Sequence, residues 1–117
     1  MRMNNIEQLD IFKRSHLVTL AVYKATAKFP KEEVYGLSAQ MKRAAVSINS
    51  NLMEGGARNS VGEYKQFIGI ARGSLSELKY QMILARDLKL MDKKDADDLV
   101  NEMEAIGRMI TGLLNKL

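Results

Sequence analysis

Apolar residues recur at intervals of three and four along most of the chain, which is the spacing of one face of an α-helix. The clearest case is residues 38–59, where the apolar face consists of Met41, Ala44, Ala45, Ile48 and Leu52. Residues 60–88 carry a longer line of the same kind, consisting of Tyr64, Ile68, Ala71, Leu75, Leu78, Met82 and Ala85. The spacing predicts an amphipathic helix in each of these stretches.

Two further helices follow from the same spacing. Residues 92–117 carry an apolar line made of Ala96, Leu99, Met103, Ile106, Ile110, Leu113 and Leu117. In residues 10–28 we assign the buried face to Phe12, His16, Leu17, Leu20, Tyr23 and Ala27. Four amphipathic helices without any strand pattern predict an all-α fold, namely an up-down antiparallel four-helix bundle.

The expected helix ends leave only short connections between the helices. Pro30 stops the first helix, because the residue before a proline is disfavoured in the helical region. Gly55 and Gly56 end the second helix, and Ser60 with Glu63 has the spacing of a capping box at the start of the third. The 117 residues are therefore expected to form one domain, with residues 1–8 as a loose, polar N-terminal tail.

Two of the predicted helices carry a second face that the bundle core does not explain. Residues 38–59 have a polar line beside the apolar one, made of Gln40, Arg43, Ser47, Asn51 and Glu54. Residues 60–88 have apolar side chains outside the core line, namely Ile70, Tyr80, Ile83 and Leu84. We interpret these faces as a second buried contact, which self-association would supply, over the alternative of a face that is merely solvated.

The second and third helices should be antiparallel neighbours, because the connection between them is short. Equal steps from a turn near residue 58 place Ser47 opposite about Gly69 and Arg43 opposite about Gly73. Glycine at those positions would let another backbone approach closely. The same register brings Arg43 within reach of Glu77, and the two would need each other if both were shielded from water.

Basic residues recur every seven positions along the third helix and form what we call the basic ridge, together with Arg58 before the helix: Arg58, Lys65, Arg72, Lys79 and Arg86. Such a row could follow the phosphates of a nucleic acid. Alternatively, these side chains lie over apolar surface and pair with acids of the fourth helix, which offers Asp95, Asp98 and Glu102. No aromatic residue is interleaved with the ridge for base stacking.

The composition narrows the function classes. The net charge of +4 permits nucleic-acid or acidic partners without requiring them. Cysteine is absent, which excludes thiolate metal sites and suits a reducing compartment. The single histidine, His16, lies on the assigned apolar face, so we expect a packed core residue and not a catalytic one. No zinc, phosphate-loop or nucleophile motif occurs, and no apolar run approaches the roughly 20 residues of a membrane span. We expect a cytoplasmic protein that is not an enzyme, with no cofactor, metal, membrane or small-molecule substrate.

Several segments carry a family resemblance. Residues 40–55 follow the pattern Q-x-x-R-A-x-x-S-I-x-x-N-x-x-E-G, and residues 73–78 follow G-S-x-x-E-L. Further matching segments are residues 9–13, 29–30 and 35–37. On these motifs the chain resembles the small four-helix-bundle proteins encoded in 23S rRNA intervening sequences, although Phe12 stands where that family often has tryptophan. The fourth helix matches only in its pattern.

This resemblance implies a left-handed four-helix bundle that assembles as a homopentamer. The chain is also similar to the accessory variability proteins of diversity-generating retroelements, which are basic pentamers that work with a reverse transcriptase and nucleic acid. Most intervening-sequence proteins have no established biochemical activity. Our preferred hypothesis is a non-enzymatic homo-oligomer that binds RNA, DNA or a nucleic-acid enzyme through repeated basic ridges. The alternative is a structural or protein-interaction scaffold whose charge serves only solubility.

Overall fold

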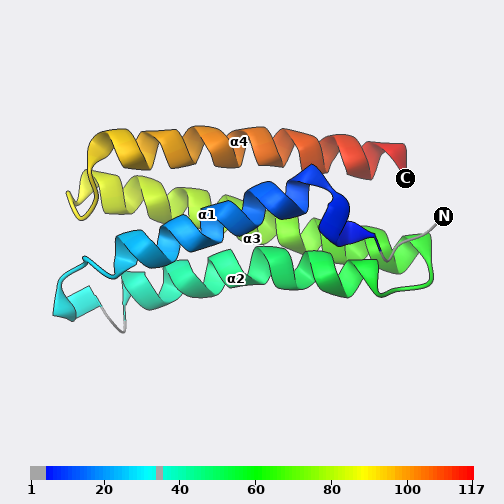
Figure 1. The fold of residues 1–117 in the computed structure, drawn as a ribbon, viewed down its shortest axis with the longest axis horizontal. Coiled ribbons are helices and arrows are strands. Elements are labelled where there is room, and N and C mark those ends of the chain that lie inside the picture. The colour runs from blue at the N-terminus through cyan, green and yellow to red at the C-terminus, as the bar shows by residue number, and fades with distance from the viewer. Residues whose placement is uncertain (1–4, 34–35) are drawn as a thin grey trace.

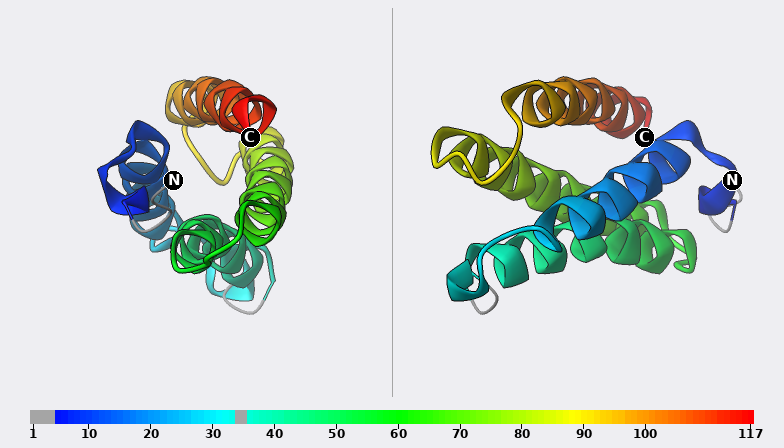
Figure 2. Two further views of the ribbon diagram at one scale, coloured as in Figure 1. Left: turned by 90° about the vertical axis from the view of Figure 1, so that its right-hand side faces the viewer. Right: turned by 60° about the vertical axis from the view of Figure 1, so that its left-hand side comes forward.

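Four long helices account for most of the computed structural model, which describes residues 5–33 and 36–117. They are α1 (Asp10–Thr26), α2 (Leu37–Gly56), α3 (Val61–Asp87) and α4 (Lys93–Lys116), with short 3-10 turns η1 (Ile6–Gln8) and η2 (Lys31–Glu33). Successive helices run in opposite directions along the long axis (Figure 1). Seen end-on, they surround one core, with α1 and α3 on opposite sides (Figure 2). The predicted all-α, up-down four-helix bundle is therefore confirmed.

The core is built from the apolar lines that the spacing assigned to α2, α3 and α4. Every member of the α2 and α3 lines is buried, and residues such as Ile48, Ile68 and Leu78 are fully so. In α4 the buried members of the line are Ala96, Met103, Ile106 and Ile110, while Leu99, Leu113 and Leu117 are partly buried. Ser60 is the N-cap of α3, as its spacing to Glu63 predicted, because Ser60 Oγ accepts a hydrogen bond from the Glu63 backbone N–H at 3.1 Å and donates one to Glu63 Oε1 at 3.2 Å.

The face assigned to α1 is wrong. Leu17, Leu20 and Tyr23 are 63%, 53% and 47% exposed, and His16 is exposed as well. The buried side chains of α1 are instead Ile11, Ser15, Val18, Val22 and Thr26. A polar residue can occupy a core position when its hydroxyl bonds the backbone of its own helix, as Thr26 Oγ1 does by donating to the Val22 carbonyl at 2.8 Å. The helix therefore buries its smaller, partly polar stripe and exposes its larger apolar one.

The beginning of the chain also differs from the expected loose tail. Residues 1–4 lie outside the described residues, so that part of the expectation stays a prediction. Ile6, however, opens the η1 turn and is only 4% exposed, within the hydrophobic core. Its burial holds this short segment against the bundle, because burying an isoleucine side chain stabilises the folded state by about 1.5–3 kcal/mol.

Helices α1 and α4 are held together by a two-pronged ion pair. Arg14 donates from Nε to Glu102 Oε2 at 2.8 Å and from Nη2 to Glu102 Oε1 at 2.6 Å. The hydrogen bonds from Arg14 lower the pKa of the Glu102 carboxyl below its ordinary value. A carboxylate with a lowered pKa adds stability above its unfolded-state pKa, and that stability is lost as the pH falls through the folded-state pKa.

Glu102→Gln is therefore expected to lower the free energy of unfolding by about 1 kcal/mol near neutral pH, the upper range for a well-aligned, half-exposed pair. At a second, acidic pH below the ordinary glutamate pKa of about 4.3, the difference from the parent should be smaller, because Glu102 loses its charge in the parent too as the pH falls through its lowered pKa. Urea denaturation at the two pH values measures both effects. The control is Lys94→Gln, because the Lys94–Asp98 pair is almost wholly in solvent and should contribute little. A deficit for Glu102→Gln that does not depend on pH would contradict the ionic role.

Candidate nucleic-acid interface

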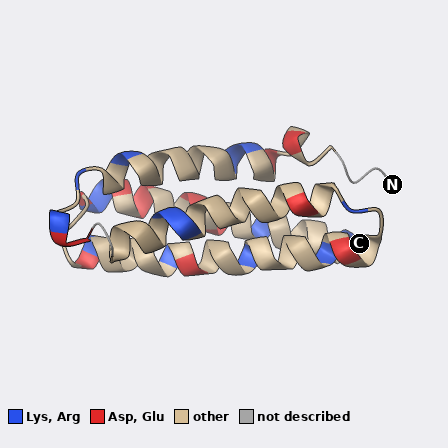
Figure 3. Ribbon diagram, turned by 90° about the horizontal axis from the view of Figure 1, so that it is seen from below, with Lys and Arg blue, Asp and Glu red and all other residues tan. Residues whose placement is uncertain are grey.

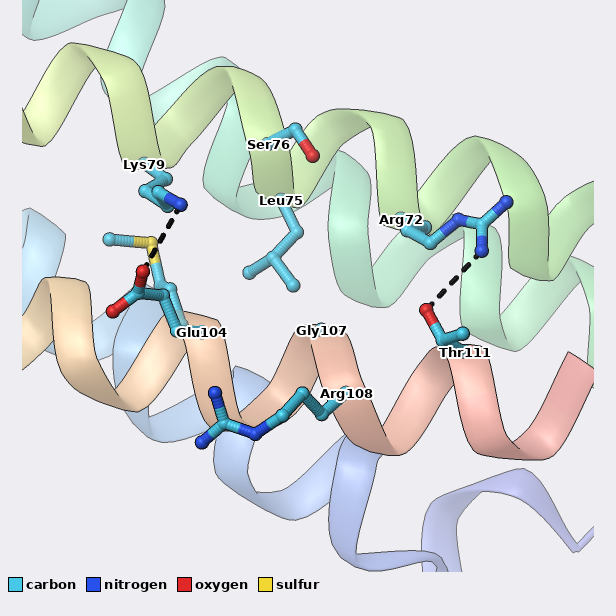
Figure 4. Close-up of a pocket in the computed structure, with 9 residues that line it drawn as sticks. Arg72, Leu75, Ser76, Lys79, Glu104, Gly107, Arg108 and Thr111 are labelled. Atoms are coloured by element: carbon cyan, nitrogen blue, oxygen red, sulfur yellow. Dashed lines mark hydrogen bonds and ion pairs between the residues drawn. The ribbon is translucent and has the colours of Figure 1, made fainter.

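An open groove runs between α3 and α4 along the line of the basic ridge. It encloses about 450 Å³ and is lined by Arg72, Leu75, Ser76, Lys79, Met103, Glu104, Gly107, Arg108 and Thr111. Figure 4 shows Leu75 of α3 pointing toward α4 between the polar residues of the two helices. Gly107 keeps the opposite wall low, since an added Cβ there would meet Leu75 Cδ2 at 3.7 Å. The groove therefore has an apolar floor and a charged rim.

The rim of this groove carries more positive than negative charge. Its cations are Arg72, Lys79 and Arg108, and its only acid is Glu104. Lys79 pairs with Glu104 at 3.3 Å. Arg72 instead donates to the Thr111 hydroxyl at 3.3 Å (Figure 4). Within residues 5–33 and 36–117, neither Arg72 nor Arg108 has an ion-pair partner, so the groove can accept an anion without first breaking a pair.

The ridge contacts α4 in a regular antiparallel register. Three ridge residues, each seven positions apart on α3, donate hydrogen bonds to three α4 residues that are also seven positions apart. Arg86 bonds Asp97, Lys79 bonds Glu104 and Arg72 bonds Thr111. Lys65, one heptad further toward the N-terminus of α3, is exposed and forms no ion pair with the described residues. The acids of α4 therefore neutralise the ridge cations near the C-terminal end of α3, and not those near its N-terminal end.

The two ends of the ridge are consequently different. Arg86 bonds Asp87 at 2.9 Å and Asp97 at 2.8 Å, and these hydrogen bonds raise the pKa of Arg86. The pKa of Asp97 is lowered by hydrogen bonds from Lys93 and, after it, from Arg86. Lys65 lies at the N-terminal end of the helix, and no carboxylate of the described residues pairs with it. The positive charge that remains available to a ligand is concentrated in the N-terminal half of α3.

Arg58 is tied to its own helix connection and not to α4. It pairs with Glu54 at 3.0 Å, and its guanidinium lies 4.7 Å from the centre of the Phe67 ring. The predicted α4 partners Asp95, Asp98 and Glu102 are wrong, because α4 turns those acids away from α3. Asp98 pairs with Lys94 and Glu102 with Arg14. The acids that face α3 are Asp97 and Glu104.

Sequence reasoning missed Arg108, which the fold brings to the groove from α4. The only signal in the sequence is that Arg108 follows Glu104 by four residues and so lies on a neighbouring part of the same helix face. Its relation to Arg72 depends on the register between α3 and α4, and helical periodicity carries no information about that register.

The polar line of α2 is divided in the structure. The hydroxyl oxygens of Ser47 and Ser74 are 2.8 Å apart, and this hydrogen bond joins α2 to α3. Asn51 Nδ2 donates to the Ser47 carbonyl at 2.8 Å within α2. Ser47 thus lies opposite Ser74 and not opposite Gly69. The predicted register was wrong because the turn is centred nearer Ser60 than residue 58.

The remaining members of this line face solvent. Gln40, Arg43 and Glu54 are exposed, as is Glu77, which accepts a hydrogen bond from Gln81 at 3.3 Å. Within the described residues Arg43 and Glu77 form no ion pair, so the expected desolvated pair is absent from the single chain.

The two glycines predicted to face α2 do not do so. An added Cβ at Gly69 or Gly73 would meet no atom within 4 Å. The apolar residues outside the core line of α3 are only partly covered: Ile70 is 44% and Tyr80 63% exposed, whereas Ile83 and Leu84 are intermediate. Leu84 packs against the hydrophobic core of its own chain, but packing within the described residues does not explain the two glycines or the exposure of Ile70 and Tyr80.

Other kinds of site gain no support from the described part of the chain. No group of three or more potential metal-ligating side chains comes together within residues 5–33 and 36–117. None of the helices described there has the length and apolar character needed to cross a bilayer. The candidate site is therefore the α3–α4 groove, where three cations line one cavity.

Comparison with known proteins matches the chain to a family described as 23S rRNA-intervening sequence protein, over residues 7–112. Among solved structures, the chain is similar to a protein of unknown function from the S23 ribosomal protein family of Bacteroides thetaiotaomicron. The two share 15% sequence identity over 89% of this chain and 97% of that chain, with a TM-score of 0.82. At this identity the likeness establishes the fold alone. No curated protein matches the chain.

Proposed function

This chain belongs to the 23S rRNA-intervening sequence protein family, and from that premise we propose that it is a non-enzymatic homo-oligomer that binds nucleic acid at the N-terminal half of α3. The observation that carries the proposal is that fewer carboxylates pair with the cations of the basic ridge toward the N-terminal end of α3. Among the residues that the structure describes, Arg86 is held by two carboxylates, Lys79 by one and Arg72 by a hydroxyl, whereas Lys65 has no ion-pair partner. The uncompensated cations are the ones that a phosphate backbone would contact.

Several further features support this proposal. Arg108 adds a cation from α4 beside Arg72, so the groove presents positive charge from two helices. The family name refers to sequences within 23S rRNA, which makes RNA the first nucleic acid to test. Assembly, with the pentamer implied by the resemblance, would repeat the site and strengthen weak contacts through multivalency. A cytoplasmic location, which the absence of cysteine suits, is part of the same proposal.

A second candidate function is a structural or protein-interaction scaffold without nucleic-acid binding. The Lys79–Glu104 and Arg86–Asp97 pairs favour it, because they show half of the ridge serving contacts between α3 and α4. Cations that join two helices of one bundle have no need of an external ligand.

Two matched double variants separate these functions, since each removes one lysine and one arginine from the same helix. Lys65→Gln/Arg72→Gln should reduce the log–log slope of RNA affinity against salt concentration by about two units, roughly one for each lost phosphate contact. Lys79→Gln/Arg86→Gln should leave the slope nearly unchanged, because those charges are already paired. Fluorescence anisotropy with labelled RNA and DNA over a salt series measures the slope, and light scattering checks that the oligomer persists.

Each alternative gives a different outcome in this experiment. Equal losses in the two double variants would mean that the whole ridge binds and that neutralisation by α4 is irrelevant. If the parent protein binds neither RNA nor DNA at low salt, the scaffold function is favoured. Arg108→Gln should reduce the slope by about one unit, and an unchanged slope would remove α4 from the proposed interface.

A further inference from the structure

The outer surface of α1 and α2 is apolar over an area that both helices share. Leu20 and Tyr23 of α1 and Val46 and Met53 of α2 are each between 43% and 53% exposed, and we call these four residues the α1–α2 face. The two helices are joined beneath it, since Thr19 Oγ1 donates to the Ala45 carbonyl at 3.2 Å and the ring of Tyr23 lies 5.6 Å from Lys42 Nζ. Large apolar residues that remain outside while Ser15 and Thr26 are buried indicate a surface that a partner covers.

A second exposed surface lies on α3, on the opposite side of the bundle from α1 (Figure 2). It consists of Ile70, Gly73, Glu77 and Tyr80, which we call the α3 face. At 100° per residue these four positions fall within a strip of about 80° on the side of α3 away from the core. Glycine in the middle of a helix costs about 1 kcal/mol relative to alanine. Since Gly73 avoids no clash within its own chain, its smooth surface is available to an incoming backbone.

The charges of the two faces are complementary. Residues 11–31 and 37–53 contain no aspartate or glutamate, whereas Lys13, Lys24 and Lys42 occur there. Figure 3, in which α2 lies toward the viewer, shows α2 free of acidic colour until its end at the α2–α3 turn. The α3 face carries the acid Glu77, which has no cationic partner among the described residues. An apolar face bordered by lysines fits an apolar face that contains a glutamate better than it fits a copy of itself.

We propose that the α1–α2 face of one copy binds the α3 face of the next copy. The proposal rests on the homo-oligomer of the proposed function and specifies how it is assembled. Two different faces on one chain make a heterologous contact, in which every copy uses one face in each direction. Such contacts close into a ring when the rotation permits and otherwise extend into a filament. A twofold dimer would instead use one face twice.

The chain has no cysteine, so single cysteines can map this contact directly. Leu20→Cys and Gly73→Cys place one thiol at the centre of each face, and Gly112→Cys on the exposed outer side of α4 is the control. Each variant is prepared alone, and pairs are unfolded, mixed and refolded before treatment with a short, flexible bis-maleimide linker. The mixture of Leu20→Cys with Gly73→Cys should give a covalent dimer on denaturing gels. Each variant alone, and the mixture of Leu20→Cys with Gly112→Cys, should remain single chains.

Light scattering on the same samples separates failure of this contact from failure of the proposed function. An oligomer in which Leu20→Cys cross-links with itself would show a twofold contact and overturn the proposal. An oligomer in which no mixture cross-links would place the interface elsewhere, with the same consequence. A monomeric parent protein would overturn the homo-oligomer itself, whereas nucleic-acid binding is decided by the salt experiment.

Discussion

Ile48→Ala is expected to lower the free energy of unfolding by about 3 kcal/mol, within the usual range for truncating a buried isoleucine to alanine. Ile48 is fully buried at the middle of α2, where its side chain packs in the core that all four helices share. The loss has two sources, namely the transfer of the removed methyl groups and the cavity that the neighbours cannot fill. Urea denaturation followed by circular dichroism measures it.

Leu17→Ala is the matched control, because sequence spacing also placed Leu17 in the core. The structure leaves it 63% exposed on α1, so its truncation should change the free energy of unfolding by less than about 0.5 kcal/mol. A loss of 2 kcal/mol or more at Leu17, in the range of about 2–5 for buried leucine, would show that α1 is turned the other way. The pair of variants therefore tests the corrected face of α1 as well as the core.

The contrast between α1 and the other helices shows where sequence patterns succeed. In α2, α3 and α4 one apolar line runs along the whole helix, and the line from Tyr64 to Ala85 could be assigned even though α3 carries further apolar side chains outside it. In α1 two apolar stripes compete, one through Val18 and Val22 and one through Leu17 and Leu20. The pattern favours the larger side chains, but burial follows the fit to α2 and α4. That fit depends on three-dimensional packing, which spacing along one helix does not contain.

The candidate interface could be predicted in part for a similar reason. The heptad spacing of Lys65, Arg72, Lys79 and Arg86 places these residues on one side of α3, and the structure retains that arrangement along the α3–α4 contact. Which cations are neutralised depends on the register with α4, and a shift of one residue along α4 would exchange Asp97 for Asp98. Sequence reasoning placed the row correctly but could not distinguish its free end from its paired end.

The same limit explains the errors between α2 and α3. The expected opposition of Ser47 and Gly69 relied on the centre of the turn, and a displacement of two residues there shifts the register by about one helical turn. With Ser47 at Ser74 instead, Gly69 and Gly73 point outward and Glu77 stays in solvent. Gly73 and Glu77, which the predicted register placed opposite α2, lie instead beside Ile70 and Tyr80 on the surface from which the assembly contact is inferred.

Gly55→Leu is expected to destabilise the bundle by about 3 kcal/mol, at the upper end of the cost of overpacking a core. Sequence analysis treated Gly55 as a helix-end signal, and α2 does end at Gly56. Among the described glycines, however, none has a positive φ, so backbone freedom is not the reason for glycine here. An added Cβ at Gly55 would lie 3.2 Å from Phe67 Cβ and 3.4 Å from the Tyr64 carbonyl oxygen, and a leucine would push α2 and α3 apart.

Gly112→Leu provides the matched control, with the same substitution in another helix. Gly112 lies within α4, is exposed, and has no atom within 4 Å of an added Cβ. Leucine there should stabilise the protein by about 0.5–1 kcal/mol, because glycine is the poorer helix former. Thermal denaturation should therefore move in opposite directions for the two variants. If both substitutions raise the melting temperature, α2 and α3 do not approach closely at Gly55, and the small residue would have to be explained by the helix end alone.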